Sequence, residues 1–402
     1  KIFFAARDRL GEKPFYYSFL PNGGFIFASE LKAILNSGLI IPEVDNSQIS
    51  NYLSFLHVDP SNTIFKNIKS LQPAEVISCK NEHLNKEKYW IHSGHQIINQ
   101  VNFSEKNLIE LKNKTKNAIH NSVKRQLDAC VEVGVFLSGG LDSSIITSVA
   151  SEYKSKIKTF SFGYDSRSEL GYSDLISKKY KTDHHHFFES NFRISDNLLE
   201  INKFFDQPFA DSACIPFFIL SKKARNFVKV CLGGDGADEI FCGYSNWYSR
   251  IEDYRSFAKN SHRVSNLIHK YLPQKYFKKA FLFKKYYDTK KITSNELEAY
   301  FNLKSVTNSS TLKKLGLNQI NINLPLTNNL PEFDNYINFD QKYYLPGDIL
   351  FFKDMMTMAN SLELRSPFLD KEILELNYQI PKNLHYHNNI GKFLLKETFK
   401  DK

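Results

Sequence analysis

The chain has 402 residues with 42% hydrophobic and 24% charged side chains, ordinary values for a globular protein large enough for two domains, and it has no apolar run long enough to span a membrane. The net charge of +10 indicates either a nucleic-acid-binding face or a lysine-rich solvated surface, and the scattered lysines favour the second. The five cysteines form no C-x-x-C pair, which argues against a disulfide framework or a zinc site and favours a reducing, cytoplasmic setting.

The first 90 residues are predicted to be rich in β-strands. Runs of β-forming residues are expected as strands at Ile2–Ala6, Pro14–Ser18, Gly24–Ala28 and Glu75–Ser78. A short helix is expected over Ser29–Ser37, with Ser29 as its N-cap. Residues 91–105 are polar and weakly patterned, and we expect a linker there.

From residue 106 onward the pattern alternates between strand and helix. Strands are expected at Val131–Leu137, Lys158–Phe162, His185–Phe188 and Val228–Leu232. Helices are expected at Leu108–Asp128, Ser143–Tyr153, Asp174–Lys181 and Ile215–Asn226. This alternation predicts an α/β domain with a parallel sheet. Residues 245–340 are expected to be mostly helical, as are residues 341–402 apart from a break at Pro367.

A glycine- and serine-rich turn, Ser138–Ser144, joins the first of these strands to its helix. Such a turn directs several backbone N–H groups to one point, and Gly139 and Gly140 allow a ligand to approach the backbone. The lysine and spacing of a Walker A loop are absent. Asp142 would repel phosphate unless a cation intervened, so we interpret it as a Mg²⁺ ligand beside a nucleotide.

A second loop, Gly233–Glu239, follows the strand that ends at Leu232, and it carries three glycines and three carboxylates. The EF-hand register is not met. Asp238 is predicted to complete the Mg²⁺ site with Asp142. Asp235 or Glu239 is expected near the nucleophile, either as a base or as an anchor.

The string S-G-G-L-D-S-S at Ser138–Ser144 resembles the PP-loop of the N-type ATP pyrophosphatases. The resemblance implies an adenine-nucleotide α-hydrolase-like fold and cleavage of ATP between its α- and β-phosphates through an acyl-adenylate. Together with the second loop, it implies a set of ATP-binding residues. These are Leu137, Ser138, Gly139, Gly140, Asp142, Ser143, Phe162, Gly233 and Gly234.

Gly233–Tyr244 resembles the second signature, S-G-E-G-S-D-E-x-F-x-G-Y, of the glutamine-dependent asparagine synthetases. Gly233 stands where that signature has Ser, and Asp235 stands where it has the Glu implicated in the ammonia step. Other matches to this family follow in chain order: Arg7–Tyr16, Phe27–Ala33, Tyr89–Trp90, Thr159–Gly163, Asp206–Asp211 with Pro216 at the acceptor pocket, Leu362–Asp370 and Gly391–Lys396.

This resemblance implies a role for Lys392, which would stabilise the charge that develops during adenylylation. Arg365 is expected to be structural or to lie on the pyrophosphate side. Members of the family often carry a His pair at the position of His184–His186 without a metal, so we interpret these histidines as structural.

The resemblance also implies a domain organisation. Residues 1–90 would be the C-terminal, β-rich end of an Ntn-type (class II) glutaminase domain, and residues 106–402 an asparagine synthetase domain, which we expect to be cut short at its C-terminus. Glutamine hydrolysis in this family uses an N-terminal Cys, whereas residue 1 is Lys. We therefore expect the full-length protein to hydrolyse glutamine and this chain alone to use free ammonia.

The function implied is that of a ligase that amidates a carboxylate, aspartate first, using ATP and Mg²⁺. Amidation of another carboxylate, such as a uronic acid of a surface polysaccharide, stays open as an alternative, as does a non-catalytic paralogue. Sulfur transfer to tRNA would use the basic charge but leaves the glutaminase-like residues unexplained. The expected partners are small molecules, with no nucleic acid and no membrane, and a homodimer stays open as the assembly.

Overall fold

The computed structural model describes residues 2–21, 23–80, 83–91, 105–164, 170–190, 192–251, 300–301, 303–307, 309–317 and 332–402. The predicted linker at residues 91–105 lies outside the described residues except for its two ends. Most of the segment 245–340, predicted to be helical, also lies outside them.

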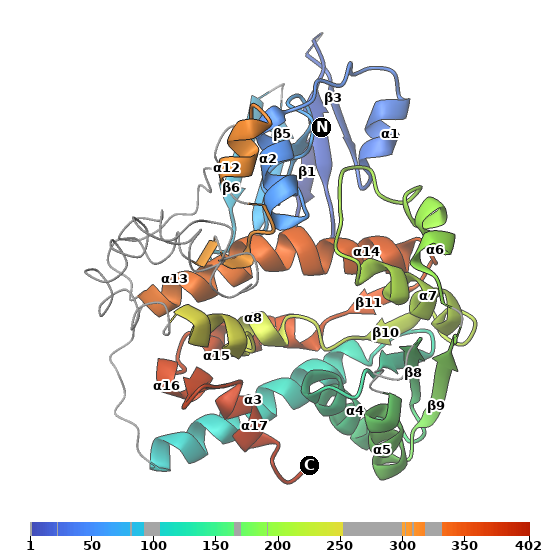
Figure 1. The fold of residues 1–402 in the computed structure, drawn as a ribbon, viewed down its shortest axis with the longest axis vertical. Coiled ribbons are helices and arrows are strands. Elements are labelled where there is room, and N and C mark those ends of the chain that lie inside the picture. The colour runs from blue at the N-terminus through green and yellow to red at the C-terminus, as the bar shows by residue number, and fades with distance from the viewer. Residues whose placement is uncertain are drawn as a thin grey trace, which may run out of the picture.

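The N-terminal part of the chain forms two small antiparallel sheets, seen at the top of Figure 1. One has the order β1-β5-β6, built from Ile2–Ala6, Glu75–Lys80 and His83–Lys88. The other has the order β3-β2-β4, built from Phe25–Ala28, Tyr16–Phe19 and Lys69–Ser70. The four predicted strands are confirmed, while β4 and β6 carry no apolar run that would have predicted them.

Two helices accompany these strands. Helix α1 spans Leu31–Asn36, and its N-cap is Glu30 in an extended conformation, so the prediction of Ser29 as the cap is wrong. Helix α2 spans Asn46–Phe55 and was not predicted, although Asp45 caps it by accepting a hydrogen bond from the Ser47 amide. Its sequence is mostly polar, which hides the helical period.

A five-stranded parallel sheet forms the centre of the larger part of the molecule, with the order β11-β10-β7-β8-β9. Its strands are β7 (Val133–Phe136), β8 (Lys158–Gly163), β9 (Asp183–Phe188), β10 (Val230–Leu232) and β11 (Glu363–Arg365). The predicted parallel α/β sheet is confirmed. Strand β11 corrects the expectation that residues 341–402 are helical.

Helices cover both faces of this sheet, as the alternating side chains of β7 require. Val133 and Val135 point into one core and Phe136 into the other, while Phe160 fills the space above Gly134. The first core is closed by α3 (Glu105–Gln126), α4 (Leu141–Tyr153), α15 (Lys371–Asn377) and α17 (Phe393–Thr398), with α5 (Leu170–Tyr180) beside α4. The second is closed by α7 (Cys214–Ala224) and α14 (Leu350–Met358), with α6 (Ile194–Ile201) beside α7.

The C-terminal region links the two parts. Helix α13 (Glu332–Phe339), the π-helix η2 (Asp340–Ile349) and α14 run in succession between the N-terminal strands and the parallel sheet (Figure 1). Lys13 Nζ lies 2.5 Å from Asp354 Oδ1, and the Ala210 amide donates to the Leu56 carbonyl at 2.9 Å, so side-chain and backbone contacts join the parts. Among the described helices, none is long and apolar enough to cross a membrane.

Short elements complete the described chain. These are α8 (Ala237–Phe241), α12 (Ser309–Lys314), the 3₁₀ turn η3 (Pro367–Leu369), α16 (Lys382–His385), β12 (Tyr386–His387) and β13 (Ile390–Gly391). Lys392 follows the β12–β13 hairpin directly and is the N-cap of α17.

Candidate active site

The two glycine-rich loops lie side by side because the strands that lead into them are neighbours. Strands β7 and β10 pair in parallel, with Val135 opposite Leu232, so their carboxyl ends meet at one edge of the sheet. The chain leaves β7 toward β8 on one side and later returns to place β10 on the other. This reversal of strand order creates a crevice, which is where open α/β sheets bind ligands.

The first loop forms a tight turn before α4. Ser138 Oγ lies 3.0 Å from Ser143 Oγ and accepts a hydrogen bond from the Gly140 amide at 3.2 Å. Gly139 has φ +89°, a left-handed conformation that favours glycine. The loop is thereby fixed at the N-terminus of a 13-residue helix, where the helix dipole favours an anion.

The second loop packs directly against the first. A Cβ atom on Gly234 would lie 2.9 Å from both Asp142 Cβ and the Ser143 amide nitrogen. Gly236 has φ +85°, and a Cβ there would meet Leu369 Cδ2 at 2.1 Å. Glycine at both positions therefore allows the second loop, Gly233–Glu239, to pack closely against its neighbours, including the first loop, Ser138–Ser144.

Lys392 joins the carboxylates of the two loops. Its Nζ lies 2.6 Å from Asp142 Oδ2 and 2.8 Å from Asp238 Oδ1, and its side chain is 10% exposed. A Cβ on Gly243 would meet Asp238 Oδ1 at 1.8 Å and Lys392 Cε at 2.3 Å, so this glycine makes room for the cluster. Three residues that come from separate motifs, with Asp142 and Lys392 250 positions apart, thus form one triad.

The electrostatics of this triad are those of a site that accepts a cation. Burial raises the pKa of Asp142 to about 6, with Asp238 adding to the rise and Lys392 opposing it. Burial acts to lower the pKa of Lys392, but the charges of Asp142 and Asp238 outweigh it, and that pKa is raised. Asp142 Oδ1 is buried and has no hydrogen-bond partner among the described residues. Two facing carboxylates and an unused oxygen fit Mg²⁺, which prefers one or two carboxylates plus phosphate oxygens.

Asp235 faces a residue that the sequence motifs do not identify. Its Oδ1 lies 2.9 Å from Lys353 Nζ, which comes from α14 and also sits 3.9 Å from the centre of the Phe217 ring. A Cβ on Gly233 would lie 2.2 Å from Asp235 Oδ2. The two departures from the asparagine synthetase signature are therefore coupled, since the Asp235 side chain folds back over the space that a serine at 233 would occupy.

Glu239 is held away from solvent. It is 2% exposed, and Tyr244 donates its hydroxyl to Glu239 Oε1. Burial raises the pKa of Glu239 to about 8, and the charge of Asp238 adds to this effect. At neutral pH the carboxyl is mostly protonated, which suits an anchor better than a base.

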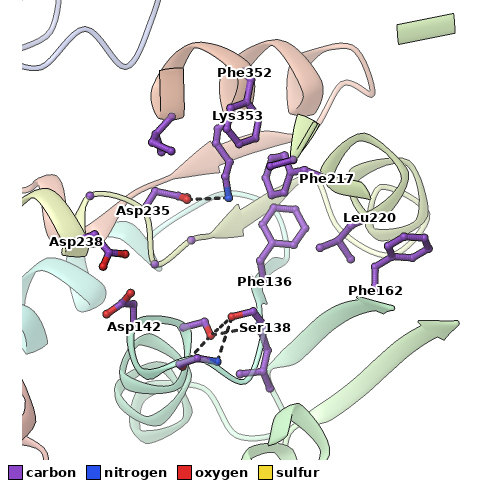
Figure 2. Close-up of a pocket in the computed structure, with 18 of the residues that line it drawn as sticks. Phe136, Ser138, Asp142, Phe162, Phe217, Leu220, Asp235, Asp238, Phe352 and Lys353 are labelled. Atoms are coloured by element: carbon purple, nitrogen blue, oxygen red, sulfur yellow. Dashed lines mark hydrogen bonds and ion pairs between the residues drawn. The ribbon is translucent and has the colours of Figure 1, made fainter. Parts of the chain in front are cut away.

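A cavity of about 390 Å³ opens beside these groups, within the size range of small-molecule sites. Figure 2 shows the carboxylates of Asp142 and Asp238 on one side and an apolar wall on the other. That wall is made of Phe136, Phe162, Phe217, Leu220, Ile349 and Phe352. Such a division suits a ligand whose anionic end carries a metal ion and whose other end is flat and apolar.

The structure brings most of the predicted site residues together. The cavity lining includes Leu137, Ser138, Gly140, Asp142, Ser143, Phe162, Gly233, Gly234, Asp235, Asp238 and Glu239. Gly139 shapes the loop without lining the cavity, and Lys392 stands behind the two aspartates it contacts. Lys353, Phe217 and Phe352 line the cavity without having been predicted, because an isolated lysine and two phenylalanines on helices carry no sequence signal.

Arg365 and Asp206 do not line this cavity. Arg365 donates to the carbonyls of Gln126 and Asp128 at the end of α3, at 2.8 and 3.0 Å, contacts that favour the structural one of its two expected roles. Asp206, from the segment expected near the acceptor pocket, accepts a hydrogen bond from the Lys32 amide at 3.2 Å. The segment that carries it thus joins the N-terminal part of the chain to the parallel-sheet part.

Comparison with known proteins agrees with this geometry. Residues 114–402 match the asparagine synthase family model, and residues 1–90 match the glutamine amidotransferase domain model. Asparagine synthetase [glutamine-hydrolyzing] 1 of Bacillus subtilis is 30% identical over 412 residues, covering 99% of this chain and 62% of that protein. Putative asparagine synthetase [glutamine-hydrolyzing] 2 of Methanocaldococcus jannaschii is 32% identical over 282 residues, covering 68% of this chain and 53% of that protein.

The chain therefore spans about three fifths of the length of the Bacillus subtilis relative and about half of the archaeal one. The match to the family model covers most of the chain, and it includes both glycine-rich loops and Lys392. With the site geometry and these matches in agreement, the chain belongs to the asparagine synthase family.

Proposed function

We propose that this chain carries out the ATP-dependent amidation of a carboxylate, with aspartate as the first candidate and asparagine, AMP and pyrophosphate as products. The observation that carries the proposal is the triad of Asp142, Lys392 and Asp238 beside a glycine-rich loop at a helix N-terminus. These groups suit a triphosphate with its metal. The relatives that match most of the chain are named for glutamine-dependent asparagine synthesis.

ATP would lie along the cavity with its two ends in different environments. The phosphates would face Ser138, Gly140 and Ser143, where backbone amides and hydroxyls are available. The adenine would lie toward Phe162 at the end of β8, within the apolar wall. Asp142 and Asp238 would hold Mg²⁺, which, when bound, supplies positive charge to the phosphate oxygens.

The first half-reaction would form an acyl-adenylate. An acceptor carboxylate oxygen attacks the α-phosphorus of ATP, the bond to the bridging oxygen of the β-phosphate breaks, and pyrophosphate leaves. Lys392 lies between the carboxylates of Asp142 and Asp238, beside the loop that would hold the phosphates. Its ammonium would therefore stabilise the negative charge that develops on the leaving pyrophosphate. The raised pKa of Lys392 keeps this charge present throughout the neutral pH range.

The second half-reaction would be attack by ammonia on the acyl carbon, with loss of a proton and release of AMP. We assign Asp235 to the ammonia side, because its side chain stands at the cavity wall with Lys353 as counter-ion. Glu239 would serve as the anchor that holds Tyr244, since its carboxyl is buried and mostly neutral. Both assignments can be separated by substitution.

We further propose the domain division 1–90, 91–105 and 106–402, with the first segment as the end of a glutaminase domain that delivers ammonia in the full-length protein. A cytoplasmic location and a homodimeric assembly remain predictions from the sequence. A glutaminase assay of this chain that shows turnover would contradict the view that it uses free ammonia.

The decisive screen measures AMP release with ATP, Mg²⁺ and ammonium chloride, over a panel of carboxylates that includes aspartate and uronic acids. We expect AMP formation that depends on one acceptor and produces its amide. Hydrolysis of ATP to ADP, or no AMP with any carboxylate, would contradict the proposal.

A uronic acid of a surface polysaccharide is the second candidate acceptor. The observation that favours it is the pair of departures at Gly233 and Asp235, where the Asp235 side chain covers the space over Gly233 and pairs with Lys353 at the cavity wall. AMP release with a uronic acid and none with aspartate would establish this alternative.

A further inference from the structure

A second group of ligating side chains lies on the edge of the parallel sheet, away from the ATP site. Strand β9 presents His184 and His186 on one face, because residues two apart share a face, and α5 places Asp174 against them. His186 Nδ1 lies 3.2 Å and His184 Nε2 lies 3.5 Å from Asp174 Oδ1. The ligating atoms of the three residues all lie within 4.8 Å of one another.

Proton counting along a chain of hydroxyls fixes the tautomer of His184. Thr182 donates its one hydroxyl proton to Ser177 Oγ at 3.0 Å, so in its 2.9 Å contact with Thr159 it is the acceptor. Thr159 has then used its own proton and must accept from His184 Nδ1, which lies 2.8 Å away. The proton of neutral His184 is therefore on Nδ1, and Nε2 carries a lone pair.

That lone pair points at a carboxylate. The His184 side chain is 9% exposed, and its Nε2 has no hydrogen-bond partner among the described residues. Two acceptors facing each other at 3.5 Å need a cation between them.

We propose that Asp174, His184 and His186 bind one divalent transition-metal ion of the Zn²⁺ class. Tetrahedral zinc with ligands at 2.0–2.2 Å has ligand–ligand separations of about 3.4 Å, close to those that Asp174 makes with the two histidines. Imidazole nitrogens with a carboxylate select this class over Mg²⁺. The hydroxyl of Thr159 acts as the outer partner that orients the His184 ring.

The exposure of the ligands suggests what the ion does. His186 is 51% exposed and Asp174 is 37% exposed, so water would complete the coordination on the outer side. Since β9 is the edge strand and α5 packs beside it, the ion would tie helix to strand. The ion would thus stabilise the packing of α5 on β9, at a site separate from the proposed Mg²⁺ position at the ends of β7 and β10. This assignment replaces the expectation that the histidines are purely structural.

Zn²⁺ binding to tag-free protein tests the proposal by isothermal titration calorimetry. Excess Mg²⁺ occupies the acidic site, and a Cys130→Ser background removes the exposed thiol as a competing ligand. We expect one Zn²⁺ per chain and a rise in Tm on Zn²⁺ addition, since a ligand that binds only the folded state stabilises it. His186→Ala and Asp174→Asn, at exposed positions, should each weaken binding by at least roughly 10-fold.

The matched control is His185→Phe. His185 lies on the same strand but faces the other way, stacked on Phe160 and tilted against Phe227, so phenylalanine keeps its packing while removing its nitrogen atoms. Zn²⁺ affinity should be unchanged in this variant. Absence of stoichiometric Zn²⁺ binding to the parent protein, or full binding in both His186→Ala and Asp174→Asn, would overturn the proposal.

Discussion

Replacing Lys392 by methionine should damage stability and catalysis in different, separable ways. Methionine keeps most of the length of the side chain but removes the ammonium that lies 2.6 Å from Asp142 and 2.8 Å from Asp238. Two carboxylates then face each other with no counter-charge. If the triad is built as described, the cost must depend on pH.

The size of the effect follows from burial. Removing one partner of a buried ion pair costs about 3–5 kcal/mol, and we expect the lower end because the Asp238 side chain is 39% exposed. Asp142 already has its pKa raised to about 6 from 3.8, and losing Lys392 raises it further. A carboxyl with a raised pKa favours folding below its unfolded value and loses that contribution as pH rises. The variant should therefore match the parent near pH 4 and be about 3 kcal/mol less stable above pH 7.

Catalysis should also fall, independently of the loss of stability. Losing one oriented charge at a developing negative charge costs about 100- to 1,000-fold in kcat. Lys396→Met is the matched control, since it removes the same charge from an exposed position one turn along α17. Urea unfolding from pH 4 to 8 and AMP release measure the two effects. A stability difference that does not vary with pH, or unchanged AMP release, would refute the reasoning.

Three further substitutions test other contacts. Glu239→Gln keeps an acceptor for the Tyr244 hydroxyl but cannot ionise. Because the pKa of Glu239 is raised from 4.5 to about 8, the parent protein loses stability as the pH rises from 4.5 to 8. In urea unfolding at pH 7 the variant should therefore be more stable than the parent by roughly 3 kcal/mol. Gly234→Ala places a methyl 2.9 Å from Asp142 Cβ, so ATP affinity in a calorimetric titration should fall at least 10-fold, whereas Gly171→Ala, with open space around it, should leave affinity unchanged. Lys353→Met should keep ATP affinity within about twofold yet lower the rate of amide formation, and equal losses in both would argue against an ammonia-side role for the pair.

Local signals in the sequence were enough to predict the central strands and both loops. The run Val131–Leu137 is apolar and is followed by glycines and a helical period, so strand, turn and helix could each be recognised within a short window. The helix limits differ from the expected ones by a few residues: α3 is already helical at Glu105, inside the expected linker, and α4 begins at Leu141. Ends of elements depend on capping geometry, which the pattern alone does not determine.

What the sequence could not predict depends on contacts between distant segments. Strand β11 has only three residues, and it exists because it pairs with β10 more than 120 residues earlier. Strand β6 is polar except for Leu84 and is held by its hairpin with β5. Lys353 has no motif around it, and its pairing with Asp235 follows from how α14 crosses the end of the sheet.

The resemblance to the asparagine synthetases was needed for site residues whose role their own chemistry did not indicate. The residues alone indicated an anion cradle and an acidic loop, while the assignment of Lys392 came from the match to the asparagine synthetases. The geometry then gave that lysine a physical setting, since the β12–β13 hairpin brings it between Asp142 and Asp238. For Arg365 the structure favours the structural role, because its guanidinium donates to two carbonyls at the end of α3.

The measurement that bears most directly on the proposed function is the exchange of labelled pyrophosphate into ATP, with Mg²⁺ and each candidate carboxylate in turn. This exchange reports reversible adenylylation and needs no source of ammonia. We predict exchange that requires one carboxylate acceptor and that is lost in Lys392→Met but kept in Lys396→Met. A preparation that binds ATP yet shows no exchange with any carboxylate, or exchange without an acceptor, would contradict the account.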